Sequence, residues 1–258
     1  MLLRVQSHLH YTPAQPCSVL LQIEAAQDAH QVVHSSSITL TDTRLVDGKD
    51  GIGTRRWIRS GTDFLCNYNA LVEVTRPIKP LRDLARDPLQ LLPSDATAYL
   101  MPSRYCQPEP FFDFVGAQFG DLTGGLRIAA ISAWIKDNFS YDISASNAQT
   151  TATDSFAQKA GVCRDYAHVL IAMARASAIP ARYVSCYAPD VSPQDFHAVS
   201  EVYLDDAWHI VDPTGMADPT KTIRIGAGLD AADVSFMMSF GWMNLVAKTI
   251  NVSEINTP

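Results

Sequence analysis

Long apolar runs are missing from this chain. No segment approaches the roughly 18 consecutive apolar residues that a membrane-spanning helix requires, so we expect no membrane partner. Residues 1–11 also lack the apolar core of a signal peptide, and their alternating polar and apolar side chains predict a strand instead. We therefore expect a protein that stays in the cytoplasm.

Basic clusters are also missing. The 20 Lys and Arg side chains stand against 27 Asp and Glu, which gives a net charge of −7 and a pI near 5.4. Proteins that bind nucleic acid usually carry a basic patch that meets the phosphates. We therefore expect no nucleic-acid partner, and solubility is enough to account for the mild acidity.

Paired cysteine motifs are missing as well. The five cysteines are scattered, odd in number and form no Cys-x-x-Cys pair, which is typical of reduced thiols in the cytoplasm. His8 and His10 have the spacing of alternate strand residues, but no further His or Cys cluster completes a metal site. The sequence therefore predicts neither a metal nor a cofactor, and it does not define an oligomeric state.

The chain is long enough for one large domain or two small ones. Clean alternation over residues 64–74, weaker alternation over 3–11 and Gly-rich turns between them predict a small antiparallel β domain. Prolines concentrate in residues 77–110, which predicts a linker with short helical pieces. We assign residues 1–105 to the β domain with its linker and residues 106–258 to a second domain.

The second domain is expected to place its helices before its strands. Ile128, Ile131 and Ile135 recur at helical spacing. Strands are predicted later in the chain, over residues 181–187, 198–204, 207–212, 221–226 and 243–252. This order predicts an α+β fold in which helices pack on an antiparallel sheet.

One cysteine lies where a loop turns into a helix. Asp154 is predicted to cap a short helix over residues 155–160, which Gly161 ends. After Cys163, apolar residues recur at helical spacing as far as Ile179. The unpaired N–H groups at such a helix start favour a thiolate, although a cysteine on an apolar helix is more often a small buried hydrophobe.

A histidine and a carboxylate follow on a predicted hairpin. The two-residue loop, which lacks the glycine usual in such turns, makes Leu204 pair with Ala207. Val199 then lies opposite Asp212. His197, two residues before Val199, falls on the same face and diagonal to Asp212, within reach of a hydrogen bond. A slip of one residue in register would separate the two side chains.

A thiol, an imidazole and a carboxylate in this order can form a nucleophile, its base and the group that orients the base. Taken singly, His197 is better read as a surface histidine and Asp212 as the start of a turn; taken together with Cys163, they are candidate catalytic residues. The backbone N–H of Cys163 is a natural oxyanion donor. Other polar or aromatic side chains of this domain are expected to be structural: Trp134, Tyr141, Gln158, Arg164, Asp165, His168, Asp230 and Asp233.

These segments resemble the bacterial transglutaminase-like superfamily of papain-like cysteine enzymes. The resemblance runs from about residue 125 to the C-terminus, and three motifs carry it: Gly161-Val-Cys-Arg-Asp-Tyr-Ala-His168, Phe196-His-Ala198 and Trp208-His-Ile-Val-Asp-Pro-Thr214. In that superfamily, the residues matching Cys163, His197 and Asp212 form the catalytic triad, and a β domain often precedes the core. Many relatives carry a Trp soon after the His-Ala pair, where this chain has Val199-Ser200.

The resemblance implies a cysteine-dependent acyl-transfer enzyme that needs no cofactor. We expect it to hydrolyse a peptide or amide bond through a thioester, because no export signal and no calcium-loop pattern is evident. Amine transfer, as in a protein-glutamine gamma-glutamyltransferase, is the alternative. A non-catalytic binding module is less favoured, because such a module would be expected to lose a triad residue and all three are present.

Overall fold

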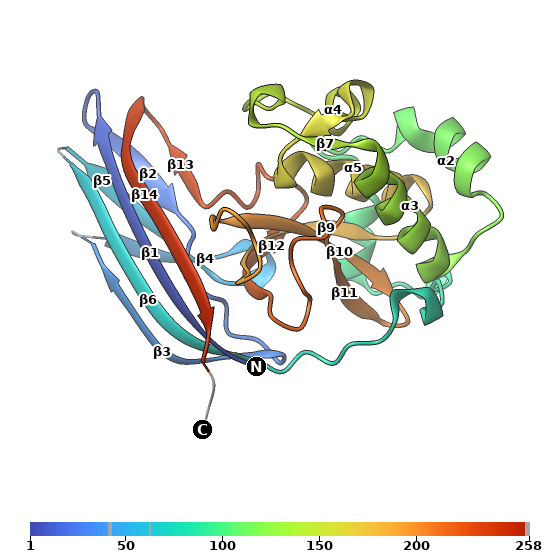
Figure 1. The fold of residues 1–258 in the computed structure, drawn as a ribbon, viewed down its shortest axis with the longest axis horizontal. Helices are drawn as coiled ribbons and strands as arrows, with labels where there is room; N and C mark the ends of the chain where they lie inside the picture. The colour runs from blue at the N-terminus through green and yellow to red at the C-terminus, as the bar shows by residue number, and fades with distance from the viewer. Residues whose placement is uncertain (41–42, 62, 256–258) are drawn as a thin grey trace.

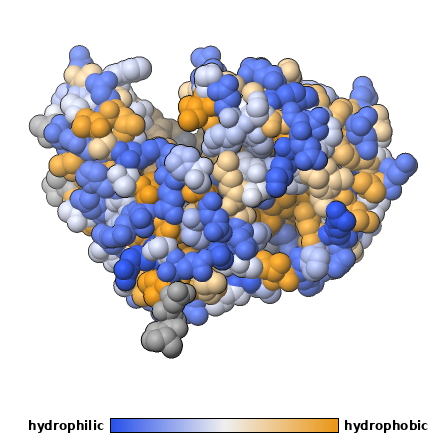
Figure 2. All heavy atoms as spheres, viewed as in Figure 1, coloured by the Kyte–Doolittle hydropathy of each residue, from blue (hydrophilic) through white to orange (hydrophobic). Residues whose placement is uncertain are grey.

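The computed structural model describes residues 1–40, 43–61 and 63–255. Strands from both ends of the chain form one lobe, and the middle of the chain forms a second lobe of helices around a sheet (Figure 1). The surface is hollowed between the two lobes, at the top of the view in Figure 2. The molecule is an α+β protein with antiparallel sheets, as the order of predicted elements indicated.

The β lobe consists of two four-stranded antiparallel sheets, with strand orders β14-β1-β6-β3 and β13-β2-β5-β4. Along β6 successive residues alternate between a buried face, which is apolar, and a more exposed face, as the sequence predicted. The strands are β1 Leu2–Pro13, β2 Cys17–Leu21, β3 Gln31–Thr39, β4 Thr43–Asp47, β5 Thr54–Ser60, β6 Phe64–Val74, β13 Met237–Ser239 and β14 Met243–Glu254.

The last strand of the chain, β14, pairs with a different strand from the one expected. β14 was expected among the strands of the second domain, but it pairs with β1, from Leu3 opposite Glu254 to Pro13 opposite Met243. Alternation of side chains predicts a strand but does not identify the strand beside it, so this return could not be predicted from the sequence. The C-terminal segment therefore crosses from the second lobe back to the first.

Helices occupy the middle of the chain. The α-helices are α1 Ser94–Thr97, α2 Phe112–Phe119, α3 Gly124–Asn138, α4 Ala152–Gln158 and α5 Cys163–Ala176. Short 3-10 turns are η1 Lys49–Gly51, η2 Leu81–Asp83, η3 Leu89–Leu91, η4 Ala98–Leu100, η5 Glu109–Phe111 and η6 Ile143–Ala145. Most of these turns lie in the proline-rich stretch. None of the helices described here has the length and hydrophobicity needed to cross a membrane.

The second lobe is built around α5. This helix is buried along most of its length and packs against a sheet with strand order β11-β10-β9-β12. The strands are β9 Ala181–Tyr187, β10 His197–Leu204, β11 Ala207–Val211 and β12 Ile223–Gly228, and a separate short parallel pair is formed by β7 Ser140–Tyr141 and β8 Ala160–Gly161. The start of α5 and the start of β10 thereby meet near the hollow between the lobes.

Candidate active site

Cys163 is the first residue of α5, as predicted. The preceding residue, Val162, is extended, and its N–H donates to Asp165 Oδ2 at 2.9 Å. A Cβ on Gly161 would lie 2.6 Å from the Asp165 Cβ, so only glycine leaves room for this buried carboxylate. Asp165 therefore holds the turn that presents the thiol at the helix start.

The short helix before Cys163 begins and ends differently from the prediction. Thr151, and not Asp154, is the N-cap of α4. Asp154 is the third helical residue, and its side chain accepts the Thr151 N–H at 2.9 Å in a reciprocal capping box. Lys159, with a left-handed φ of 54°, ends the helix two residues before Gly161. The Thr-x-x-Asp pattern was the signal that could have located this start.

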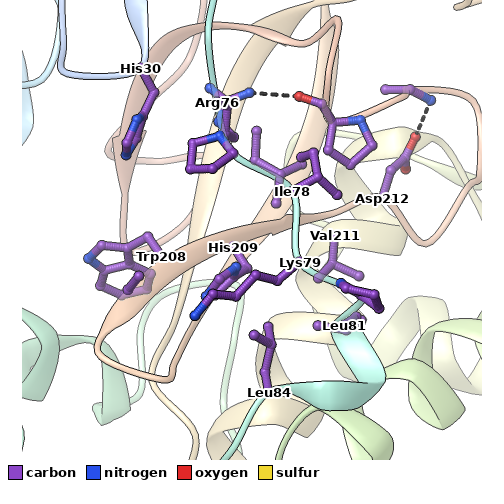
Figure 3. Close-up of a pocket in the computed structure, with 16 residues that line it drawn as sticks. His30, Arg76, Ile78, Lys79, Leu81, Leu84, Trp208, His209, Val211 and Asp212 are labelled. Atoms are coloured by element: carbon purple, nitrogen blue, oxygen red, sulfur yellow. Dashed lines mark hydrogen bonds between the residues drawn. The ribbon is translucent and has the colours of Figure 1, made fainter.

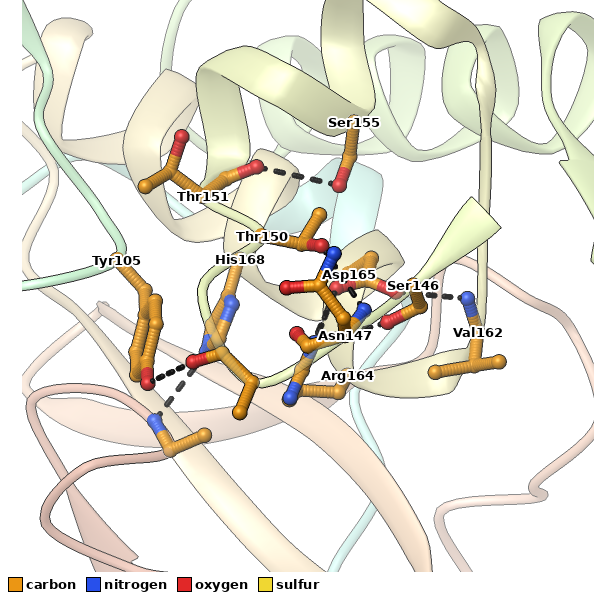
Figure 4. A network of polar contacts seen from close by, with 12 residues as sticks. Tyr105, Ser146, Asn147, Thr150, Thr151, Ser155, Val162, Arg164, Asp165 and His168 are labelled. Carbon is orange, nitrogen blue, oxygen red and sulfur yellow. Dashed lines mark hydrogen bonds and ion pairs between the residues drawn. The ribbon is translucent and has the colours of Figure 1, made fainter. Parts of the chain in front are cut away.

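Arg164 ties a neighbouring loop to the start of α5. Its Nη2 donates to Ser146 Oγ at 2.8 Å and to the Asn147 carbonyl at 2.6 Å, and it contacts Asp165 Oδ1 at 3.2 Å (Figure 4). These contacts agree with the structural role expected for Arg164 and Asp165.

His168 is buried and neutral. Burial, together with the charges of Arg164 and Arg175, holds its pKa well below the usual range. Its Nε2 accepts the Ala231 N–H at 3.2 Å, and its ring stacks on Tyr105 at 5.1 Å (Figure 4). A neutral ring committed to packing agrees with the structural role expected for this histidine.

The hairpin has the predicted register. Leu204 lies opposite Ala207, and the pairing continues to Ser200 opposite Val211. Both loop residues, 205 and 206, have positive φ, at 53° and 60°, so two aspartates adopt the primed turn that normally favours glycine. The register is therefore the one that brings the histidine and the carboxylate together.

His197 and Asp212 form a buried pair. The His197 Nε2 lies 3.0 Å from Asp212 Oδ2, and the two side chains are only 1% and 2% exposed. Asp212 also accepts the N–H groups of Thr214, Met216 and Ala217 at 2.7 to 3.0 Å. Because these donors fix the carboxylate, it fixes the orientation of the ring.

Electrostatic contacts keep both members of this pair ionised although the pair is buried. Burial disfavours the imidazolium, but hydrogen bonds and negative charge from Asp212 and Cys163 outweigh it and raise the pKa of His197 to about 10. Burial also opposes the charged form of Asp212, yet the contact with His197 and the surrounding donors lower its pKa. The site therefore holds a protonated histidine between a carboxylate and a thiol.

Cys163 differs from the other four thiols in its surroundings. All five cysteines are free, and Cys163 is the one that is partly exposed. Burial raises the pKa of Cys66 and Cys106 to about 12, and it raises that of Cys186 well above its usual range. A protonated, buried thiol is a poor nucleophile, so Cys163 is the most accessible candidate nucleophile among the five thiols.

Tyr141 belongs to the site, although the sequence suggested a structural role. Its hydroxyl lies against the thiol and the backbone N–H of Cys163, and burial together with the Cys163 charge raises its pKa. The parallel pair of β7 and β8, with Tyr141 opposite Gly161, places it there. No local pattern marks a two-residue parallel pairing, which is why the sequence did not reveal this contact. Trp134 packs against Phe114, Phe139 and Phe156, and Gln158 is exposed at the end of α4, so neither contacts the thiol.

Two cavities flank the three residues. One, of about 310 Å³, is lined by Cys163 and His197 and by residues of both lobes. The other, of about 370 Å³, reaches Asp212 and is lined by residues such as Arg76 and Trp208, but not by Cys163 or His197 (Figure 3). The cavity that can bring a substrate to the thiol is therefore the first.

Known proteins are similar to this chain over part or all of its length. The family described as Transglutaminase-like superfamily matches residues 117–213. A proposed cysteine protease from Cytophaga hutchinsonii has a TM-score of 0.95 at 29% identity, over 100% of this chain and 92% of that chain. The periplasmic domain of TgpA from Pseudomonas aeruginosa has a TM-score of 0.39 at 19% identity, over 82% and 77% of the two chains.

A curated relative covers less of the chain. An uncharacterized protein from Mycobacterium leprae is 28% identical over 116 residues, which is 42% of this chain and 42% of the relative's own length. Cys163, His197 and Asp212 all lie inside the region that the family matches. That match identifies residues 117–213 as a transglutaminase-like domain, and the whole fold is similar to that of the protein from C. hutchinsonii.

Proposed function

We propose that this protein is a cysteine hydrolase that cleaves a peptide or amide bond through a thioester, with Cys163, His197 and Asp212 as its catalytic triad. One observation carries the proposal. The partly exposed thiol lies beside a buried imidazole whose other ring nitrogen is held by a buried carboxylate. This is the arrangement that an activated nucleophile requires.

The reaction follows from the protonation states. The Cys163 thiolate attacks the carbonyl carbon, and the electron pair of the carbonyl moves onto oxygen. As the tetrahedral intermediate collapses, the His197 imidazolium gives its proton to the leaving amine, and the thioester remains. His197 then accepts a proton from water, the hydroxide attacks the thioester, and the carboxylic acid leaves as the thiolate is restored.

Two further groups support the transition state in this scheme. The backbone N–H of Cys163, at the start of α5, is one donor to the oxyanion. The Tyr141 hydroxyl lies against that N–H and is our candidate for the second donor. Asp212 stays ionised and stabilises the imidazolium as it forms.

Water is proposed over an amine as the acyl acceptor. Five free and scattered thiols fit the reducing cytoplasm, which is where we propose that the protein acts. Cross-linking of proteins would be hazardous in that compartment. The proposed assignment of the protein from C. hutchinsonii as a cysteine protease also supports hydrolysis.

A competition experiment separates the two activities. A library of peptides and amides, including glutamine-containing peptides, is incubated with the protein in the presence of a labelled primary amine. We expect release of ammonia or of the leaving amine to exceed incorporation of the label, and Cys163→Ala to show neither. Incorporation in excess of hydrolysis at millimolar amine would make the protein an amine transferase.

A further inference from the structure

The cavity beside Cys163 is lined by both lobes. α5 contributes Cys163, β10 contributes His197, and the C-terminal segment contributes Met237 and Met238 of β13 and Lys248 of β14. The return of this segment to the β lobe therefore builds one wall of the site. A substrate that reaches the thiol must contact that wall.

One part of the wall is apolar. The rings of Phe196 and Phe236 stack with their centroids 4.5 Å apart and their planes 11° apart. Met237 and Met238 line the same cavity, and all four side chains are only partly buried. Stacked rings and flexible thioethers form a surface that accepts a bulky apolar group.

The charges that line the cavity are not balanced. The Lys248 ammonium is paired with Asp195, and the Arg164 guanidinium contacts Asp165. The third Lys or Arg side chain at the cavity is Arg104, whose guanidinium lies 4.9 Å from the centre of the Tyr105 ring and is exposed. Over the residues that the structure describes, no carboxylate lies within ion-pair distance of Arg104. One guanidinium at the cavity is therefore free to meet an anion.

This unpaired cation stands out because the protein as a whole is acidic, with a net charge of −7. A neutral substrate would leave the guanidinium that stacks near the Tyr105 ring without a counter-ion. A carboxylate would supply that counter-ion, since its two coplanar oxygens match the fork of N–H donors on the guanidinium.

We infer that the substrate is an anionic peptide or N-acyl compound. A bulky apolar side chain lies against Phe196, Phe236 and the two methionines, and a carboxylate binds Arg104. The inference rests on the proposed function, because it names the substrate class of the same site. It makes Arg104 a specificity residue that takes no part in bond breaking.

The test measures binding without turnover. Four fluorescently labelled hexapeptides combine Phe or Ala at one position with Asp or Asn at the neighbouring position. Each peptide is titrated with the Cys163→Ala variant, and binding is followed by fluorescence anisotropy. The peptide with Phe and Asp should bind about threefold to fivefold more tightly than the peptide with Phe and Asn, because an ion pair with an exposed guanidinium is worth up to about 1 kcal/mol. It should also bind more tightly than the peptide with Ala and Asp.

A matched pair of arginines then tests the assignment. Arg104→Gln, added to Cys163→Ala, should remove the preference for Asp over Asn and keep the preference for Phe over Ala. Arg44→Gln should change neither, because Arg44 is an exposed arginine on β4 that does not line this cavity. Equal binding of the Asp and Asn peptides, or a preference that survives Arg104→Gln, would overturn the inference.

The two proposals fail in different ways. Turnover of the same peptides is measured with the unmodified protein. If the Asp peptides bind through Arg104 but no peptide is cleaved, the proposed hydrolysis is wrong and the inference on ligand class stands. If neutral peptides are cleaved as fast as anionic ones, the hydrolysis stands and the inference on ligand class is wrong.

Discussion

The imidazole of His197 and the carboxylate of Asp212 lie 3.0 Å apart with both side chains almost fully buried. Water does not reach this contact, so each group depends on the other and on its remaining donors for its charge. Because Nε2 is committed to Asp212, the other ring nitrogen is the one left for the thiol. The relationship therefore sets both the protonation and the orientation of the proposed base.

Substitution of the three proposed catalytic residues should reveal unequal roles. We expect Cys163→Ala and His197→Ala to abolish turnover, because the nucleophile and its base are lost. Asp212→Asn should lower the turnover rate by about 10² to 10⁴-fold, because the imidazole loses the charge that orients it. Steady-state rates on a peptide cleaved by the unmodified protein provide the measurement, and circular dichroism checks that each variant is folded.

The same variants should show non-additive effects. The triple variant should be no slower than Cys163→Ala, because the three residues act as one unit. A triple variant slower by the product of the separate losses would show that they act independently. Asp212→Asn should also lower the free energy of unfolding by about 1–3 kcal/mol, because its amide would face the N–H of Ala217 or Thr214.

His197 should remain protonated well above neutral pH. Its pKa is raised to about 10, and Cys163 supplies part of the hydrogen bonding and charge that raise it. We expect Cys163→Ala to lower the pKa of His197, which NMR titration of the imidazole C–H signals would detect. An unchanged pKa would show that the thiol does not contact the ring.

The raised pKa of His197 makes the stability of the folded protein depend on pH. Protonation of His197 stabilises the folded protein fully below its ordinary unfolded pKa of about 6.5. That contribution is lost as the pH rises toward 10. The unmodified protein should therefore lose more stability than Cys163→Ala between these two pH values, as measured by urea unfolding.

Glu201 should make the protein sensitive to acid. Burial opposes its charge, but Arg224 and Arg182 outweigh burial and lower its pKa to about 2. Its contribution to stability is complete above the unfolded pKa of about 4.3 and is lost as the pH falls toward 2. Glu201→Gln should lower the free energy of unfolding near neutral pH by about 3–5 kcal/mol, because the buried Arg182 loses its ion-pair partner and the buried Arg224 keeps only Asp28.

Urea unfolding between pH 7 and pH 2 measures the effect. The difference between the unmodified protein and Glu201→Gln should shrink as the pH falls. Glu109→Gln is the control, since Glu109 is exposed and should show no such difference. A constant difference at every pH would mean that packing, and not charge, explains the loss.

The sequence predicted the parts of the site that depend on local rules. The two-residue loop fixed the register of the hairpin, so the contact of His197 with Asp212 could be inferred without coordinates. The helical period after Cys163 located the start of α5 in the same way. These features depend on spacing along a single element or a tight turn.

Contacts between distant segments could not be predicted. The pairing of β14 with β1 joins the two ends of the chain, and alternation in either strand is the same with any partner. Tyr141 reaches Cys163 through a parallel pair too short to leave a pattern in the sequence. The cavity wall from β13 depends on the same long-range return of the chain.

The alkylation rate of Cys163 tests the central claim most directly. The folded protein is treated with limiting iodoacetamide, and labelling of the five cysteines is followed by mass spectrometry. Cys163 should react fastest, because it is partly exposed and lies at a helix start beside a protonated imidazole, whereas the other four thiols are buried. His197→Ala should slow its labelling. If Cys163 reacted no faster than Cys17, Cys66, Cys106 and Cys186 in the folded protein, it would not be the nucleophile.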